Sequence, residues 1–135
     1  MALVQSVRNH AYKIEKFVSL PATSGTTVGI SVPAGTMVLA AGFQNTVAVP
    51  DVTTYTVAVT DGTTTFMAAT SFDAAAINTV KAGSTAGLCA VAETIDVLTS
   101  ITGSPGIITG RVWAIVVDVN KAADAASSVD REQLA

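Results

Sequence analysis

The fold of this 135-residue chain is decided by one stretch, Thr53-Thr-Tyr-Thr-Val-Ala-Val-Thr60, Asp61-Gly62, Thr63-Thr-Thr-Phe-Met-Ala68. Asp-Gly accepts the positive φ angles of a type I′ turn, and Thr, Val, Tyr and Phe fit a pleated surface. Two alternating runs around such a dipeptide predict a β-hairpin.

The register of this hairpin follows if Thr60 and Thr63 flank a two-residue loop. The predicted core-facing pairs are Val59 with Thr64, Val57 with Phe66, and Tyr55 with Ala68. The opposite face would carry Thr54, Thr56, Ala58, Thr65 and Met67. We expect this second face to be polar enough to meet water and small enough to lie under a partner protein.

The rest of the chain predicts further short strands. Extended patterns occupy 11–20, 28–32, 37–43, 88–92, 94–101 and 107–119, and we expect loops at 71–78 and 81–87. Because no helical period is sustained, we predict an all-β fold, a single-domain antiparallel β-sandwich or jelly roll. Residues 11–120 would form this domain, between an N-terminal arm at 1–10 and a polar C-terminal tail at 121–135.

Composition narrows the classes of partner. Apolar residues make up 50% of the chain, charged residues 13%, and mean hydropathy is +0.54, so we expect apolar surface that a partner covers. The longest apolar run, 112–117, is far shorter than the roughly 18 residues of a membrane span. The net charge is −3 and the seven basic residues are scattered. We therefore expect no membrane and no nucleic acid partner.

Side chains with catalytic potential are few. His10 is the only histidine and stands in an unpatterned start, while Cys89 has apolar neighbours typical of an inert, buried thiol. Glu93 and Asp96 are three apart on a predicted strand, so they would point to opposite faces as solvated edge charges. No spacing predicts a metal, phosphate or cofactor site. We expect no enzymatic activity.

Trp113, the only tryptophan, lies within the apolar run of the last predicted strand. It could stack on a sugar with Tyr55, but an anchor in the core or in an interface is the better interpretation.

The chain resembles the small β-sandwich head decoration, or cement, proteins of tailed bacteriophages, including those of cyanobacterial viruses. The resemblance covers about residues 28–120. It rests on Val32-Pro-Ala-Gly-Thr-Met-Val-Leu39, on the Thr/Val strand that closes on Asp61-Gly62 and reaches Phe66, and on Gly110-Arg-Val-Trp-Ala-Ile-Val-Val117. Thr63-Thr-Thr65 stands where this family would have more polar, charged residues.

The resemblance implies a virion protein without catalysis that is made in the host cytoplasm and binds the outer surface of the phage head. Its partner would be the major capsid protein, whose neighbouring subunits it would bridge, and we expect it to be a homo-oligomer, a trimer or a dimer. Residues 1–10 are either a disordered end or an arm that orders on docking. The candidate capsid or oligomer contacts are Leu3, Val4, Val7, Arg8, Thr54, Thr56, Thr65 and Trp113.

Two other classes share this composition. A tail, baseplate or fibre module of a virion would look similar. A carbohydrate-binding β-sandwich would need an exposed aromatic platform, and aromatic residues make up only 5% of the chain.

Overall fold

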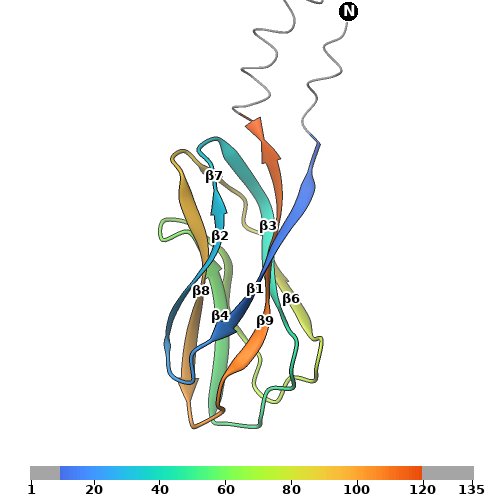
Figure 1. Ribbon diagram of the computed structural model, residues 1–135, viewed down its shortest axis with the longest axis vertical. Coiled ribbons are helices and arrows are strands. Elements are labelled where there is room, and N and C mark those ends of the chain that lie inside the picture. Colours follow the sequence, from blue (N-terminus) through green and yellow to red (C-terminus); the bar gives the residue numbers. More distant parts are fainter. Residues whose placement is uncertain (1–9, 120–135) are drawn as a thin grey trace, which may run out of the picture.

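A computed structural model describes residues 10–119, which form two antiparallel sheets packed face to face (Figure 1). Sheet A has the strand order β1-β9-β3-β6, with β7 also paired to β3, and sheet B has the order β2-β8-β4-β5. The strands are β1 (Tyr12–Leu20), β2 (Gly25–Val32), β3 (Thr36–Asn45), β4 (Thr54–Thr60), β5 (Thr65–Ser71), β6 (Val80–Gly83), β7 (Gly87–Cys89), β8 (Glu93–Thr102) and β9 (Ile108–Asp118).

The pairing is nested along the chain. The first strand pairs with the last, β2 pairs with β8, β3 pairs with β6 and β7, and β4 pairs with its neighbour β5. A long hairpin rolled up in this way gives the double-sheet jelly roll, so the predicted fold class is confirmed. Because β1 and β9 are antiparallel, the start of β1 and the end of β9 lie at the same end of the sandwich (Figure 1).

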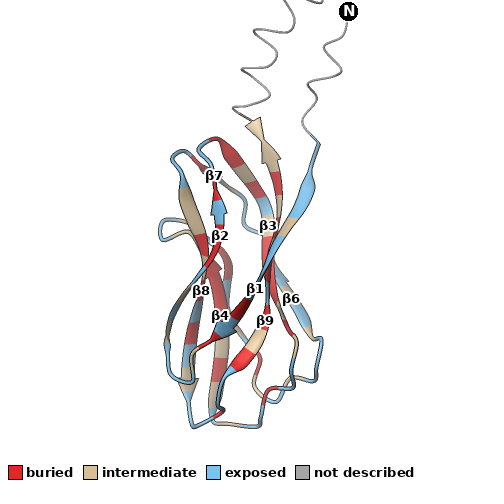
Figure 2. Ribbon diagram, viewed as in Figure 1, coloured by how far each residue is buried: buried red, intermediate tan, exposed pale blue. Residues whose placement is uncertain are grey.

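The core lies between the two sheets. Buried and exposed residues alternate along most strands, as expected when each sheet turns one face inward (Figure 2). The largest fully buried side chains come from both sheets, and the rings of Phe43 and Phe72 meet edge to face with centroids 5.5 Å apart. Burial of Tyr55, Val57 and Val59 confirms the predicted core face of β4.

The predicted hairpin exists, but its register is wrong. Thr60 pairs with Thr65 rather than Thr63, so the connection has four residues instead of two. Asp61 explains the difference, because its Oδ1 accepts hydrogen bonds from the backbone N–H of Thr63 at 2.8 Å and of Thr64 at 2.6 Å. This arrangement requires positive φ only at Gly62, where φ is 93°, and not at Asp61.

The shifted register changes which residues of β5 are buried. Two register shifts interrupt the β4–β5 pairing, and Val59 faces Met67 while Val57 faces Thr70. Phe66 and Met67 are therefore both buried, and Ala68 is exposed. The prediction placed Met67 outside and Ala68 in the core, and both assignments are wrong.

The segment after β5 also departs in part from expectation. Residues 72–79 form the predicted irregular crossing from sheet B to sheet A. The predicted loop at 81–87 is confirmed only at 84–86, because Val80–Gly83 is a short strand that pairs with one end of β3. The strand predicted at 88–92 is present but shorter, as Gly87–Cys89, which pairs with the other end of β3. Gly83 lets the end of β6 lie close to β5 of the other sheet, since a Cβ there would overlap the backbone of Phe66. Within residues 10–119, no helix is long and apolar enough to cross a membrane.

Candidate functional site

The contact residues predicted from sequence divide between two opposite surfaces of the sandwich. Thr54, Thr56 and Thr65 lie outward on sheet B, and Trp113 lies outward on sheet A. The other four, Leu3, Val4, Val7 and Arg8, lie outside the described residues. The predicted set is therefore not one contiguous patch.

The outer surface of sheet B, here called the threonine face, is built from small side chains. Its register places β4 beside β8, so that Thr54 faces Thr102, Thr56 faces Ser100 and Ala58 faces Leu98. On the flanking strands the face continues through Thr26, Ser31, Thr65 and Ser71. Hydroxyl and methyl groups dominate this surface because Thr and Ser occupy the positions that alternate with the buried Val and Tyr residues.

Charge on the threonine face is largely engaged by the fold itself. Asp96 lies outward beside Thr60, and its Oδ1 accepts a hydrogen bond from the backbone N–H of Gly29 at 3.2 Å. The predicted role of Asp96 as a solvated edge charge is therefore wrong. Its carboxylate instead binds the irregular part of β2, where the register shifts between Thr27 and Ile30.

The outer surface of sheet A carries larger side chains. Trp113 on β9 faces Gly42 on β3, and the indole lies against the position that a Cβ of residue 42 would occupy. Glycine at 42 thus lets the ring lie flat on the sheet. The ring is half-buried and its Nε1 is buried without a hydrogen-bond partner in the described residues. Trp113 is therefore packed on the outside of the sheet rather than in the inter-sheet core.

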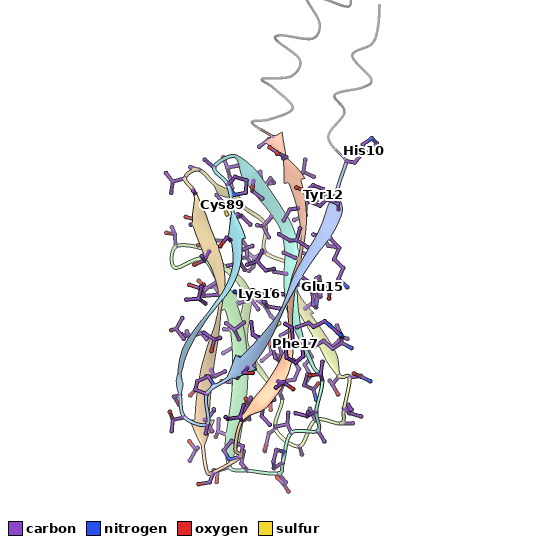
Figure 3. All side chains as sticks on the ribbon, in the orientation of Figure 1. His10, Tyr12, Glu15, Lys16, Phe17 and Cys89 are labelled. Carbon is purple, nitrogen blue, oxygen red and sulfur yellow. The ribbon has the colours of Figure 1, made fainter. Side chains whose placement is uncertain are left out.

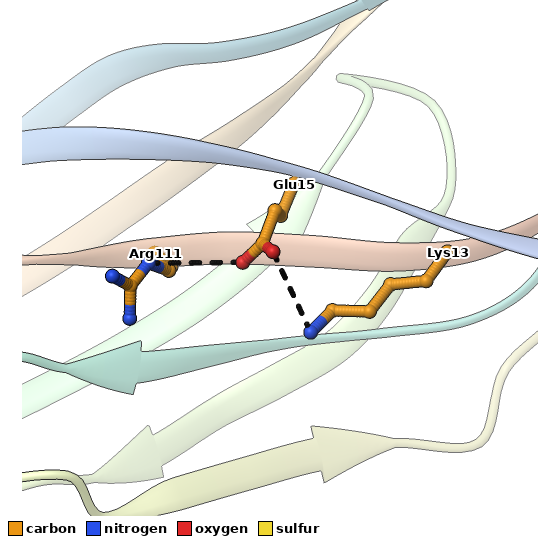
Figure 4. Close-up of polar contacts among 3 residues, drawn as sticks. All are labelled: Lys13, Glu15 and Arg111. Carbon is orange, nitrogen blue, oxygen red and sulfur yellow. Dashed lines mark ion pairs between the residues drawn. The ribbon is translucent and has the colours of Figure 1, made fainter.

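An ion-pair group lies beside Trp113 on the same surface (Figure 4). Glu15 on β1 approaches the Nζ of Lys13 at 3.7 Å and the Nε of Arg111 at 3.8 Å. All three side chains are about half exposed, so these pairs contribute little to stability. They give this surface a mixed-charge strip that the threonine face lacks.

Three titratable groups that the sequence did not associate meet at one end of the sandwich. Asp61 in the β4–β5 turn, Cys89 at the end of β7 and Glu93 at the start of β8 place one ligand atom each within 4.8 Å of one another. The Cys89 thiol donates to Asp61 Oδ2 at 3.8 Å. Glu93 stays partly exposed at the start of β8, and its carboxyl group also belongs to this cluster.

The three groups shift one another's pKa values in different directions. Burial raises the pKa of Asp61, but hydrogen bonds from the Thr64 N–H, Glu93 and the Thr63 N–H outweigh burial and lower it overall. A hydrogen bond with Asp61 and then burial raise the pKa of Glu93. Burial and the two carboxyl groups raise the pKa of Cys89 to about 12. Because thiolate is the form that ligates metals and attacks electrophiles, Cys89 is an inert thiol near neutral pH.

Burial confirms the predicted core position of Cys89. The remaining candidate of the sequence analysis, His10, stands at the start of β1, and Figure 3 shows its side chain at the edge of the sandwich, well away from Cys89. Sequence reasoning missed the Asp61–Cys89–Glu93 group because its members come from separate strands and turns. The one available signal was the Asp-Gly turn, which marked where the first of them would lie.

Comparison with known proteins shows a shared fold. A chain in the acid-stable capsid structure of the Helicobacter pylori bacteriophage KHP30 matches with a TM-score of 0.55 and 11% sequence identity. The match covers 80% of this chain and 91% of that one. A chain from the disulfide-linked pili of Bacillus endospore appendages matches at 12% identity over 83% of this chain and 90% of that one, with a TM-score of only 0.38, too low to indicate a common fold. No protein-family model and no curated protein matches the sequence.

Proposed function

We propose that this protein is a non-catalytic structural component of a phage virion, a decoration or cement protein that binds the outer surface of the head. The observation that carries the proposal is the match along most of both chains to a phage capsid chain. Because folds are reused for many functions, a fold match supports a role only together with the character of the surface.

The chemistry of the surface supports the same role. Among residues 10–119, the Asp61–Cys89–Glu93 group lies at one end of the sandwich, and its thiol is inert near neutral pH. What the molecule presents instead are two broad sheet surfaces. A protein that binds only the assembled lattice stabilises it by mass action, and repetition over many sites multiplies a modest contact.

We assign the major capsid protein to the threonine face. Small uncharged side chains on a flat sheet can approach a partner closely, and few charges lose their hydration on contact. Thr54, Thr56 and Thr65 would contact neighbouring capsid subunits at this face. Residues 1–10 would form a second contact, with Leu3, Val4 and Val7 supplying apolar groups and Arg8 a charge.

The experiment adds purified protein to capsids stripped of decoration and measures co-sedimentation and the temperature of DNA release. The proposal expects saturable binding and a higher release temperature. Thr56→Arg should remove binding, because it places a charge in the middle of the threonine face. Ser19→Arg is the matched control, since it makes the same kind of change on the outer surface of sheet A.

Deletion of residues 1–10 should abolish capsid binding while the far-ultraviolet circular dichroism spectrum stays that of a β-sandwich. Unchanged binding of the truncated protein would contradict the role of the arm. The second part of the test asks whether the protein is found on isolated phage heads or on isolated tails. Recovery of the protein from tails alone would favour a tail, baseplate or fibre module instead.

A further inference from the structure

The free edges of the two sheets differ in how they are protected. In sheet B, β2 has a register shift against β8, and β5 has two against β4. In sheet A, β6 and β7 are only four and three residues long. Bulged or very short edge strands discourage pairing with another chain. β1 has neither feature, because its nine residues pair with β9 in one uninterrupted register.

Lysines on an edge strand usually protect it, and β1 carries two of them. Both are engaged within the molecule. Lys16 reaches across to sheet B, where its Nζ donates to the backbone carbonyl of Gly29 at 3.1 Å. Lys13 pairs with Glu15 on its own strand. Neither lysine therefore presents an unpaired charge along the edge of β1.

The exposed aromatic side chains lie on the same strand. Of the large hydrophobic side chains that residues 10–119 leave exposed, both aromatic ones lie on β1, Tyr12 at 49% and Phe17 at 56%. Figure 3 shows them along β1 with Glu15 and Lys16. A long, regular edge strand with exposed aromatic residues is the kind that pairs with another strand.

The order of charges along β1 selects a partner. When two copies of β1 pair antiparallel about a two-fold axis at Ile14, Lys13 faces the partner's Glu15 and Glu15 faces the partner's Lys13. In the same register Tyr12 faces the partner's Lys16, so no like charges meet at these positions. An axis at Lys13, Glu15 or Lys16 would oppose that residue to its own copy in the partner. Like charges directly opposite each other destabilise these three registers.

We propose that β1 is a homotypic interaction edge, at which two copies of this chain pair antiparallel with Ile14 on the two-fold axis. Sheet A then continues from one copy into the other, and the threonine faces of both copies stay uncovered. A single strand pair buries a small area, so the association is weak and depends on concentration. This inference does not depend on the capsid role, because it rests on β1 alone.

The test uses the full chain in sedimentation equilibrium over concentrations from about 1 µM to about 1 mM, the range of weak dimers. We expect a monomer–dimer equilibrium. Lys13→Glu and Glu15→Lys, made separately, each create like-charge pairs across the axis, so each should raise the dimer Kd about tenfold or more. An equimolar mixture of the two variants should restore association, because each Glu then faces a Lys of the other variant.

Asp51→Lys is the matched control, since it changes the net charge as Glu15→Lys does but lies exposed in the loop before β4. It should leave the dimer Kd unchanged, and circular dichroism verifies that every variant is folded. A wild-type protein that stays monomeric throughout overturns the proposal. So does a dimer that survives both single substitutions, or a mixture that fails to associate.

Discussion

The two outer surfaces of this sandwich are built on the same core but differ in the size and charge of what they present. Sheet A displays Trp113 over Gly42 and an ion-pair strip around Glu15, and it ends in the regular edge strand β1. Sheet B displays threonine and serine, and both of its edge strands are irregular. Our proposals use this difference, with self-association at the edge of sheet A and lattice binding on the face of sheet B.

The largest losses of stability should come from substitutions in the core between the sheets, and these losses should be similar for residues of either sheet. Phe43→Ala in sheet A and Phe66→Ala in sheet B each remove a fully buried ring, so each should lower the free energy of unfolding by about 3–5 kcal/mol. Chemical denaturation measures both. Tyr55→Phe is the control, because the buried hydroxyl of Tyr55 has no hydrogen-bond partner within residues 10–119 and its loss should be neutral or stabilising. A large cost in one sheet only would show that the core is not shared.

The outer surfaces should differ more modestly in what they contribute to folding. Trp113→Ala removes a half-buried ring packed on Gly42, so we expect a loss of about 2 kcal/mol, roughly half that of a core aromatic residue. Leu98→Ala, on the threonine face, removes a side chain that is 44% exposed and should cost less than about 1 kcal/mol. Denaturation midpoints measure both losses. If the two variants lose equal stability, Trp113 is packed no more tightly on sheet A than Leu98 is on sheet B.

A smaller effect should come from the end of the sandwich where the sheets meet at Asp61, Cys89 and Glu93. The raised pKa of Glu93 means that the folded protein keeps a proton that the unfolded chain releases above about pH 4. This contribution to stability is present at low pH and is lost as the pH rises through the folded pKa of Glu93. The lowered pKa of Asp61 acts in the opposite sense, because its contribution is lost as the pH falls through the folded value. The pair should therefore stabilise the fold most near pH 4.

Glu93→Gln separates the contribution of Glu93 to stability from that of Asp61. The amide can still donate a hydrogen bond to Asp61 but does not titrate, so the decline in unfolding free energy between about pH 4 and pH 7 should flatten. Glu15→Gln controls for removing a carboxylate elsewhere. If the unfolding free energies of Glu93→Gln and the wild type vary with pH in parallel, the folded protein does not keep an extra proton at Glu93.

Alternation of residues along the chain was enough to predict the β-sandwich and most of its strands. It predicted the long last strand within one residue at each end and the inward face of β4. It failed where a side chain competes with the backbone for hydrogen bonds, because Asp61 lengthens the turn by binding two N–H groups. It also failed at β6, which it assigned to a loop, because two of its four residues are Ala and Gly and its pairing depends on the distant strand β3.

The candidate sites were harder to predict for a similar reason. Threonines at alternate positions of one strand share a face, so Thr54 and Thr56 could be assigned together from sequence. The contact of Asp61 with Cys89 and Glu93 joins a turn of sheet B to a strand of sheet A, and no local pattern encodes such a meeting. The protection of each sheet edge likewise becomes visible only when the register of every pair is known.

We propose above that the threonine face binds the outer surface of a phage head. The most direct measurement is the binding isotherm of the full-length protein on capsids stripped of decoration, with Thr56→Arg and Ser19→Arg measured in parallel. We expect saturable binding for the wild type and Ser19→Arg, and loss of binding for Thr56→Arg. Absence of wild-type binding would contradict the capsid role, and equal binding by both variants would contradict the assignment of the face.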